Sequence, residues 1–184
     1  MILPIVAYGD PILKKTTQNV EKGKTDLKRL AEDMFETMYN AKGVGLAAPQ
    51  IGLSLRVFVI DAELLDDEDE NLKGLKKVFV NAKILEETGE TWSFEEGCLS
   101  IPGIRGEVIR PEKLTINYFD TDWNEFTETY EGLAARVIQH EYDHIEGKLF
   151  IDYLTPMKKQ VIKNKLINII KGDVKVEYRM RFPK

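Results

Sequence analysis

The chain has 184 residues, 43% of them hydrophobic, and a formal net charge of -5 at pH 7. This length suits one domain, and the apolar fraction is large enough to bury a core, which argues against wholesale disorder. The negative charge disfavours nucleic-acid binding along the chain, and no uncharged apolar run approaches the ~18 residues of a membrane span.

The apolar N-terminal residues do not resemble a signal peptide. Residues 1–7 lack a charged start, and Pro4, Gly9 and Asp10 interrupt the apolar run. The chain has a single cysteine, so an intrachain disulfide is excluded. We therefore expect a cytoplasmic protein that has neither a membrane nor a specific nucleic-acid sequence as its partner.

The first predicted element is a helix over residues 25–42. Its apolar residues recur at helical spacing: Leu27, Leu30, Ala31, Met34 and Met38. Asp26 or Thr25 can cap its start, and Gly43 can end it. A loop with two glycines and a proline follows.

Four segments rich in β-branched and aromatic residues are predicted strands: residues 55–60, 78–85, 114–119 and 125–130. Between the first two lies an acidic segment, residues 61–70. It lacks the alternating ligands and the glycine of a calcium-binding loop, so we interpret it as a solvated loop.

The C-terminal third predicts two helices and a strand. The first helix covers residues 132–146, and the second starts at Thr155, with Pro156 at its first position, and closes at Gly172. Apolar and charged residues then alternate over 174–182, which indicates a strand with one buried face. This mixture of helices and scattered strands favours an α+β fold.

A metal-binding pattern lies in the helix over residues 132–146. His140, Glu141 and His144 form an H-E-x-x-H sequence. On a helix, histidines four residues apart share one face and can bind one metal ion, while the glutamate can reach a water there. These are the only histidines of the chain, and Cys98 is its only cysteine. A catalytic site needs three protein ligands and an open position, and these three side chains could supply them.

The same helix face continues with apolar side chains. Leu133 and Val137 precede Glu141 by eight and four residues. An apolar pocket beside a hydrolytic metal suits a substrate with a long apolar side chain, such as methionine. The alternative is that Leu133 and Val137 are ordinary core residues.

Three segments give the chain a close resemblance to the peptide deformylases. They are Gly-Val-Gly-Leu-Ala-Ala-Pro-Gln at 43–50, Glu-Gly-Cys-Leu-Ser at 96–100 and Gln-His-Glu-Tyr-Asp-His at 139–144. The likeness extends from Gly9 to about Leu154. It implies a single domain over residues 1–184, with mostly antiparallel strands packed around the central helix that carries H-E-x-x-H. Residues 157–184, predicted above as a helix and a strand, form a basic C-terminal extension of this domain.

The resemblance also implies the function and the role of each site residue. The substrate would be the N-formyl-methionine end of a newly made polypeptide, and formate would be released. The metal ligands would be Cys98, His140 and His144, with Glu141 as general base and Gln50 and Leu99 as oxyanion donors. Residues implied to contact the substrate are Gly45 at the peptide backbone, Val44, Leu133 and Val137 around methionine, and Arg136 and Arg105 beside the peptide.

One divalent metal ion per chain is implied, with iron(II) as the native metal. The ligand set alone does not select iron, because a thiolate and two imidazoles also suit zinc. Zinc, nickel or cobalt could occupy a purified sample.

Two other interpretations of the H-E-x-x-H motif remain open. A zinc endopeptidase of the H-E-x-x-H kind would take its third ligand downstream, where Glu146 or Asp152 could serve. A purely structural metal would need a fourth protein ligand, and after Cys98 and the two histidines only a carboxylate remains.

The charges are distributed unevenly along the chain. Residues 157–184 hold nine basic residues against Asp173 and Glu177, a charge of +7, so residues 1–156 carry -12. A basic tail on an acidic body favours a partner of opposite charge on one side. The ribosome, whose surface is largely RNA phosphate, is the partner we predict for Lys158, Lys159, Lys163 and Lys165; a solvated helix face is the alternative.

Overall fold

The computed structural model describes residues 1–184 and has an α+β fold, as predicted. Its helices are α1 (Leu27–Asn40), α2 (Gly132–Ile145) and α3 (Pro156–Ile170). Its strands are β1 (Ile5–Val6), β2 (Gly45–Ala47), β3 (Val57–Asp61), β4 (Lys76–Cys98), β5 (Ile101–Phe119), β6 (Glu125–Glu131) and β7 (Met180–Arg181). None of the helices is both long enough and apolar enough to cross a bilayer.

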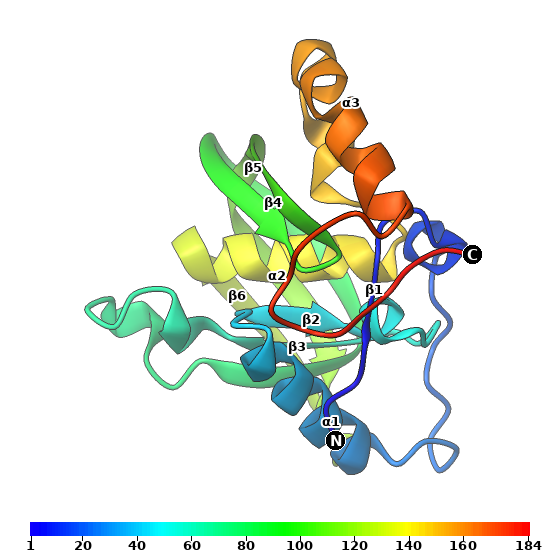
Figure 1. Cartoon of the computed structure of the whole chain (residues 1–184). Helices are drawn as coiled ribbons and strands as arrows, with labels where there is room; N and C mark the ends of the chain where they lie inside the picture. Colours follow the sequence, from blue (N-terminus) through cyan, green and yellow to red (C-terminus); the bar gives the residue numbers. More distant parts are fainter.

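Five of the strands form one antiparallel sheet in the order β2-β3-β4-β5-β6. Helix α2 packs against this sheet and runs through the middle of the molecule (Figure 1). Ala134, Ala135 and Ile138 of α2 join Phe58 and Phe79 of the sheet in one buried cluster. The central helix is therefore held by apolar contacts along its length, which fixes the side chains on its other face.

The hairpin of β4 and β5 is much longer than the predicted strands. The sequence signal covered residues 78–85 and 114–119, whereas the two strands pair as far as their connecting turn at Leu99 and Ser100. The stretch 86–95 is mostly exposed and rich in charge, so it lacks the apolar alternation that reveals a half-buried strand. The extension carries Cys98 to the metal-binding motif.

The predicted capped starts of α1 and α3 are confirmed, while α1 ends at Asn40, two residues before the predicted end. Asp26, rather than Thr25, caps α1 by accepting a hydrogen bond from the amide of Arg29 at 3.1 Å. Thr155 caps α3 by accepting from the amide of Lys158 at 3.2 Å, with Pro156 at the first helical position.

The C-terminal strand is shorter than predicted. Apolar residues from Val174 to Phe182 are half-buried and the charged ones between them are exposed, as the alternation indicated. Only Met180 and Arg181 pair with another strand, parallel to β1. The rest of the segment is irregular chain, with bends at Glu177 and Tyr178, whose apolar side chains pack against the body.

Candidate metal centre

The last turns of α2 bring both histidines of the motif together. Their rings lie 5.2 Å apart between centroids, and His144 is fully buried while His140 is nearly so. Cys98, at the end of β4, brings its sulfur to 3.5 Å from Nε2 of His144. The ligand atoms of all three residues lie within 4.8 Å of one another. These side chains, predicted from their scarcity and spacing, therefore form one cluster.

The ligand set fits a divalent metal ion. A thiolate and two imidazoles are donors that suit iron, zinc, nickel or cobalt. Nδ1 of His140 is 2.9 Å from Oε1 of Glu96, which leaves its Nε2 free to bind. Three protein ligands leave one position open, as a hydrolytic site requires.

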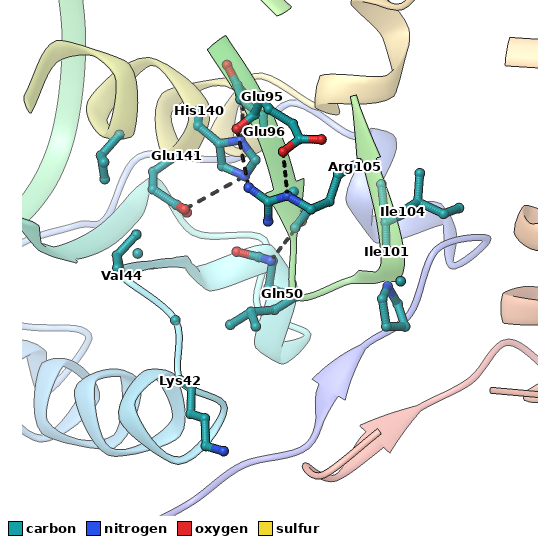
Figure 2. A pocket seen from close by; sticks show the side chains of 18 of the residues that line it. Lys42, Val44, Gln50, Glu95, Glu96, Ile101, Ile104, Arg105, His140 and Glu141 are labelled. Carbon is teal, nitrogen blue, oxygen red and sulfur yellow. Dashed lines mark hydrogen bonds and ion pairs between the residues drawn. The ribbon is translucent and has the colours of Figure 1, made fainter. Parts of the chain in front are cut away.

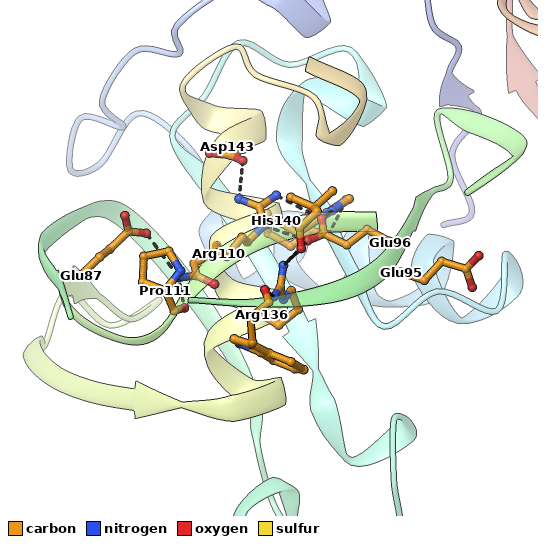
Figure 3. Close-up of polar contacts among 12 residues, drawn as sticks. Glu87, Glu95, Glu96, Arg110, Pro111, Arg136, His140 and Asp143 are labelled. Atoms are coloured by element: carbon orange, nitrogen blue, oxygen red, sulfur yellow. Dashed lines mark hydrogen bonds and ion pairs between the residues drawn. The ribbon is translucent and has the colours of Figure 1, made fainter. Parts of the chain in front are cut away.

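A buried network of charges surrounds Glu96 (Figure 3). Arg110 donates to both carboxylate oxygens, from Nε to Oε2 at 2.8 Å and from Nη2 to Oε1 at 3.0 Å. Nη1 of Arg136 donates to Oε2 at 2.9 Å, and Nη1 of Arg110 also reaches Asp143 at 2.8 Å. The two carboxylates, Glu96 and Asp143, and the two arginines thus compensate one another's charge in a buried network. The Glu96 carboxylate of this network also contacts His140.

The pKa values of the cluster reflect this network. Burial opposes ionisation of Glu96, but hydrogen bonds from His140 and Arg110 outweigh it and hold the pKa of that carboxyl well below its usual range. Burial likewise lowers the pKa of His140, but its bonds to Cys98 and Glu96 prevail and raise it. Burial and the nearby His140 lower the pKa of His144. The cluster therefore favours one positive charge, such as a proton on His140. A bound metal ion can take the place of that proton.

Glu141 lies beside this cluster. Its Oε1 is 3.9 Å from Nε2 of His140, and its Oε2 is buried without a hydrogen-bond partner. Burial raises its pKa to about 7, although the charge of His140 acts against the rise. The side chain packs against Gly45, where a Cβ atom would stand 2.6 Å from Oε1. A glycine at that position is therefore needed to admit the carboxylate.

Gln50 is fixed so that its amide N–H groups face the turn after β4. Its Oε1 accepts from the backbone amide of Ala47 at 3.0 Å, which sets the orientation of the amide group. Its Nε2 lies 3.5 Å from the sulfur of Cys98 and 3.2 Å from the hydroxyl of Ser100. Leu99 lies between these two residues, so both predicted oxyanion donors lie at the metal cluster.

A cavity of about 680 Å³ opens at this cluster (Figure 2). Its lining includes most of the predicted site residues: Val44, Gly45, Gln50, Cys98, Leu99, Arg105, Arg136, Val137, His140 and Glu141. Leu133 is not among the lining residues; it packs on the core cluster under α2. Arg136 is buried, and its guanidinium is bonded to Glu96 and to the carbonyls of Val108 and Trp92. Arg105 is exposed at the rim and paired with Glu95 at 3.4 Å.

Some residues that line or support the cavity were not predicted, because no sequence pattern marks them. Phe94 stands on β4 in a stretch with few other apolar residues, and Leu65 comes from the acidic segment. Arg110, which supports the cluster from β5, is far from every motif. Glu96 is part of the Glu-Gly-Cys segment, and that adjacency was the only available signal for it.

The downstream carboxylates that a zinc endopeptidase would use are engaged elsewhere. Glu146 pairs with Nη2 of Arg56 at 2.5 Å. Asp152 accepts from the amide of Leu149 at 2.9 Å. Neither belongs to the group of side chains that could hold a metal ion.

Comparison with known proteins agrees with this geometry. Residues 2–160 match the polypeptide deformylase family. The peptide deformylase of Cytophaga hutchinsonii is 59% identical over 183 residues, which cover 100% of this chain and 98% of that protein. That of Christiangramia forsetii is 58% identical over 190 residues, covering 100% and 97%.

Solved structures show the same likeness. A peptide deformylase from Legionella pneumophila superposes with a TM-score of 0.82 at 43% identity, covering 94% of this chain and 98% of that one. The enzyme from Thermus thermophilus gives 0.83 at 39% identity, with 94% and 100% covered. The chain belongs to the polypeptide deformylase family, the metal-dependent hydrolases that remove the N-formyl group from newly made polypeptides.

Proposed function

We propose that Cys98, His140 and His144 hold one divalent metal ion and that the formyl group of the substrate is hydrolysed beside it. The observation that carries the proposal is the group of three ligand atoms within 4.8 Å, with Oε1 of Glu141 3.9 Å from His140. When bound, the metal lowers the pKa of water and polarises the formyl carbonyl. The products are formate and a free amino terminus.

Glu141 is the general base and then the general acid. A carboxylate takes the proton from the attacking water and delivers it to the nitrogen of the leaving amine. Efficient transfer in both directions needs a pKa near the working pH. Burial raises the pKa of Glu141 to about 7, which suits that double role.

Gln50 and Leu99 stabilise the negative charge that develops on the formyl oxygen. The side-chain amide of Gln50 is oriented before substrate arrives, since its oxygen is already bonded to the amide of Ala47. Donors fixed in advance need no reorganisation during the reaction, which is why they contribute strongly to the rate. The backbone N–H of Leu99, in the turn after Cys98, is the second donor.

The methionine side chain occupies the apolar part of the cavity. Val44 and Val137 line it together with Phe94. Leu133 packs on the same core cluster as Val44 and supports this wall from behind. The peptide backbone runs past Gly45, and Arg105 lies where the chain leaves the cavity; Arg136 acts on the site through Glu96.

Iron(II) is the metal we propose for the native enzyme, in the cytoplasm. Zinc, nickel or cobalt can replace it in a purified sample, because the same three donors bind each of these ions.

The ribosome is the partner we propose for the basic face of α3. Lys159, Lys163 and Lys165 are exposed, Lys158 is half-buried, and none of the four forms an ion pair with the acidic body. Helix α3 also projects from the rest of the molecule (Figure 1). Its lysines are therefore available to a phosphate surface.

The direct test is formate release from a formyl-Met peptide by protein prepared without oxygen, with metal analysis of the same sample. We expect turnover in proportion to bound metal, at one ion per chain. Stoichiometric metal without formate release would contradict the proposal.

A further inference from the structure

The segment after α3 crosses the molecule before it reaches β7. In Figure 1 it is drawn in red, leaving α3, bending across the face that holds β2 and α2, and returning beside β1. Backbone amides of Ile5 and Ala7 bond to the carbonyls of Arg179 and Arg181, each at 2.9 Å. Its apolar side chains pack on two core clusters. The segment is therefore held at a defined place over the sheet.

Four consecutive residues of this segment line the cavity of the metal cluster: Lys175, Val176, Glu177 and Tyr178. They lie outside residues 2–160, which match the family, although relatives such as the enzyme of Cytophaga hutchinsonii align over the whole chain. The cavity consequently has a wall to which none of the family motifs contributes. A peptide bound in this cavity would pass beside it.

Tyr178 fixes this wall to the turn of the oxyanion donor. Its hydroxyl donates to the carbonyl oxygen of Leu99 at 2.7 Å. On the other side, a Cβ atom on Gly43 would stand 2.7 Å from Cδ1 of Leu99, so the leucine side chain has little room to shift. The backbone carbonyl of Leu99 is thus held by the C-terminal segment, while its side chain packs against Gly43.

The charges at the rim are paired except for one lysine. Nζ of Lys42 lies 3.0 Å from Oε2 of Glu177, and Nε of Arg105 lies 3.4 Å from Oε2 of Glu95. Lys175 is exposed, lines the same cavity and forms no ion pair. The rim therefore has an excess positive charge on the C-terminal wall, which attracts an acidic side chain.

We propose that residues 175–178 form a wall of the peptide cleft, at which Tyr178 positions Leu99 and Lys175 favours an acidic side chain beyond the formylmethionine. The inference rests on the proposed function of this cavity. Tyr178 is a positioning residue, since it acts through the turn and not on the substrate. Lys175 is a specificity residue, since it meets the part of the peptide that leaves the cavity.

Peptide charge tests the role of Lys175. We expect kcat/KM for formyl-Met-Ala-Glu to exceed that for formyl-Met-Ala-Lys by about two- to fivefold at low salt, the range of exposed ion pairs. Lys175→Glu should reverse this order, and the preference of the parent should fade in 1 M salt, where the Debye length is ~3 Å. The matched control is Lys22→Glu, an exposed lysine outside the cavity, which should keep the preference of the parent. An unchanged preference in Lys175→Glu overturns the specificity role.

Removal of one hydroxyl tests the role of Tyr178. Tyr178→Phe keeps the ring and loses only the bond to Leu99, so we expect kcat to fall about three- to tenfold, the effect of one neutral hydrogen bond, with KM unchanged. Tyr8→Phe is the matched control, because the hydroxyl of Tyr8 makes no hydrogen bond and does not line the cavity. Equal kcat values in the two variants overturn the positioning role. A metal-loaded parent that releases no formate would instead overturn the proposed function.

Discussion

Oε1 of Glu96 lies 2.9 Å from Nδ1 of His140, so a buried carboxylate near the end of β4 holds a ring on α2. This bond settles which nitrogen of the ring is occupied and how the ring is turned. A partner of that kind also makes an imidazole a stronger metal ligand. Two arginines, Arg110 and Arg136, keep the carboxylate ionised although it is buried.

The first prediction concerns this carboxylate. Glu96→Gln keeps the size of the side chain but leaves two buried arginines without their shared anion. We expect metal affinity to fall about 10–100-fold, as for other groups that orient a ligand. The free energy of unfolding should fall by about 3–5 kcal/mol, as when one partner of a buried ion pair is removed.

Metal competition with a chelator and unfolding in urea measure these two effects. The matched control is Glu95→Gln, the same change one residue earlier, where the side chain is exposed and pairs only with Arg105. It should alter neither quantity by much, since exposed ion pairs contribute about 0–1 kcal/mol. If the two variants bind metal equally well, Glu96 does not act on His140.

The second prediction concerns proton transfer. Glu141→Gln keeps the shape and much of the hydrogen bonding but cannot accept a proton. We expect full metal content and a turnover reduced by at least the roughly 10²–10⁴-fold that general acid–base groups contribute. Metal analysis and formate release from the same preparation check it. Near-normal turnover with metal bound would remove Glu141 from the mechanism.

The third prediction concerns oxygen. Iron(II) beside the Cys98 thiolate is readily oxidised, and the sulfur itself can be oxidised in steps. Cys98 is only partly buried, so oxygen can reach it. We expect the iron form to lose activity in aerated buffer and the nickel form to keep it longer. Equal half-lives of the two forms would contradict this expectation.

The fourth prediction concerns the residue that carries the formyl group. Val44, Phe94 and Val137 offer an apolar wall to an unbranched side chain such as methionine. Shortening that side chain should cost about 1–3 kcal/mol in kcat/KM. Formyl-Met and formyl-Gly peptides of otherwise equal sequence measure the difference. Equal rates would place the methionine pocket elsewhere.

Much of the metal cluster could be predicted because it depends on spacing within one helix and on residue types that are rare in this chain. The spacing of His140 and His144 is set by the helix itself, and Cys98 was the only thiol available to them. The caps of α1 and α3 are equally local, since Asp26 and Thr155 bond to amides three residues away. Such features need no knowledge of how distant segments meet.

The parts that were missed depend on contacts between distant segments. Arg110 reaches Glu96 across the hairpin of β4 and β5, and nothing near Arg110 in the sequence marks it. Residues 86–95 of that hairpin, on β4, are mostly exposed and charged, so they have no apolar period. Leu133 shares a helix face with Val137, yet the sheet that packs on α2 decides which of the two meets the cavity.

The last prediction concerns docking to the ribosome. Lys158, Lys159, Lys163 and Lys165 lie on α3 without ion pairs, and residues 157–184 carry +7 against -12 for the rest of the chain. Binding of lysines to RNA phosphate releases counterions, so log affinity should fall linearly with log salt, by roughly 0.7–0.9 per phosphate contact. Weak, salt-sensitive cosedimentation with ribosomes is therefore expected.

Changing the four lysines of α3 to glutamate separates docking from chemistry. None of them lines the cavity, so turnover of a free formyl-Met peptide should persist while cosedimentation at low salt is lost. Reversing the charge turns attraction to phosphate into repulsion, which makes the effect larger than neutralisation would. The slope of log affinity against log salt for the parent gives the number of phosphate contacts, which can be compared with the four lysines. If the reversed protein sediments with ribosomes as well as the parent does, α3 is an ordinary solvated helix and the enzyme meets nascent chains by another surface or in solution.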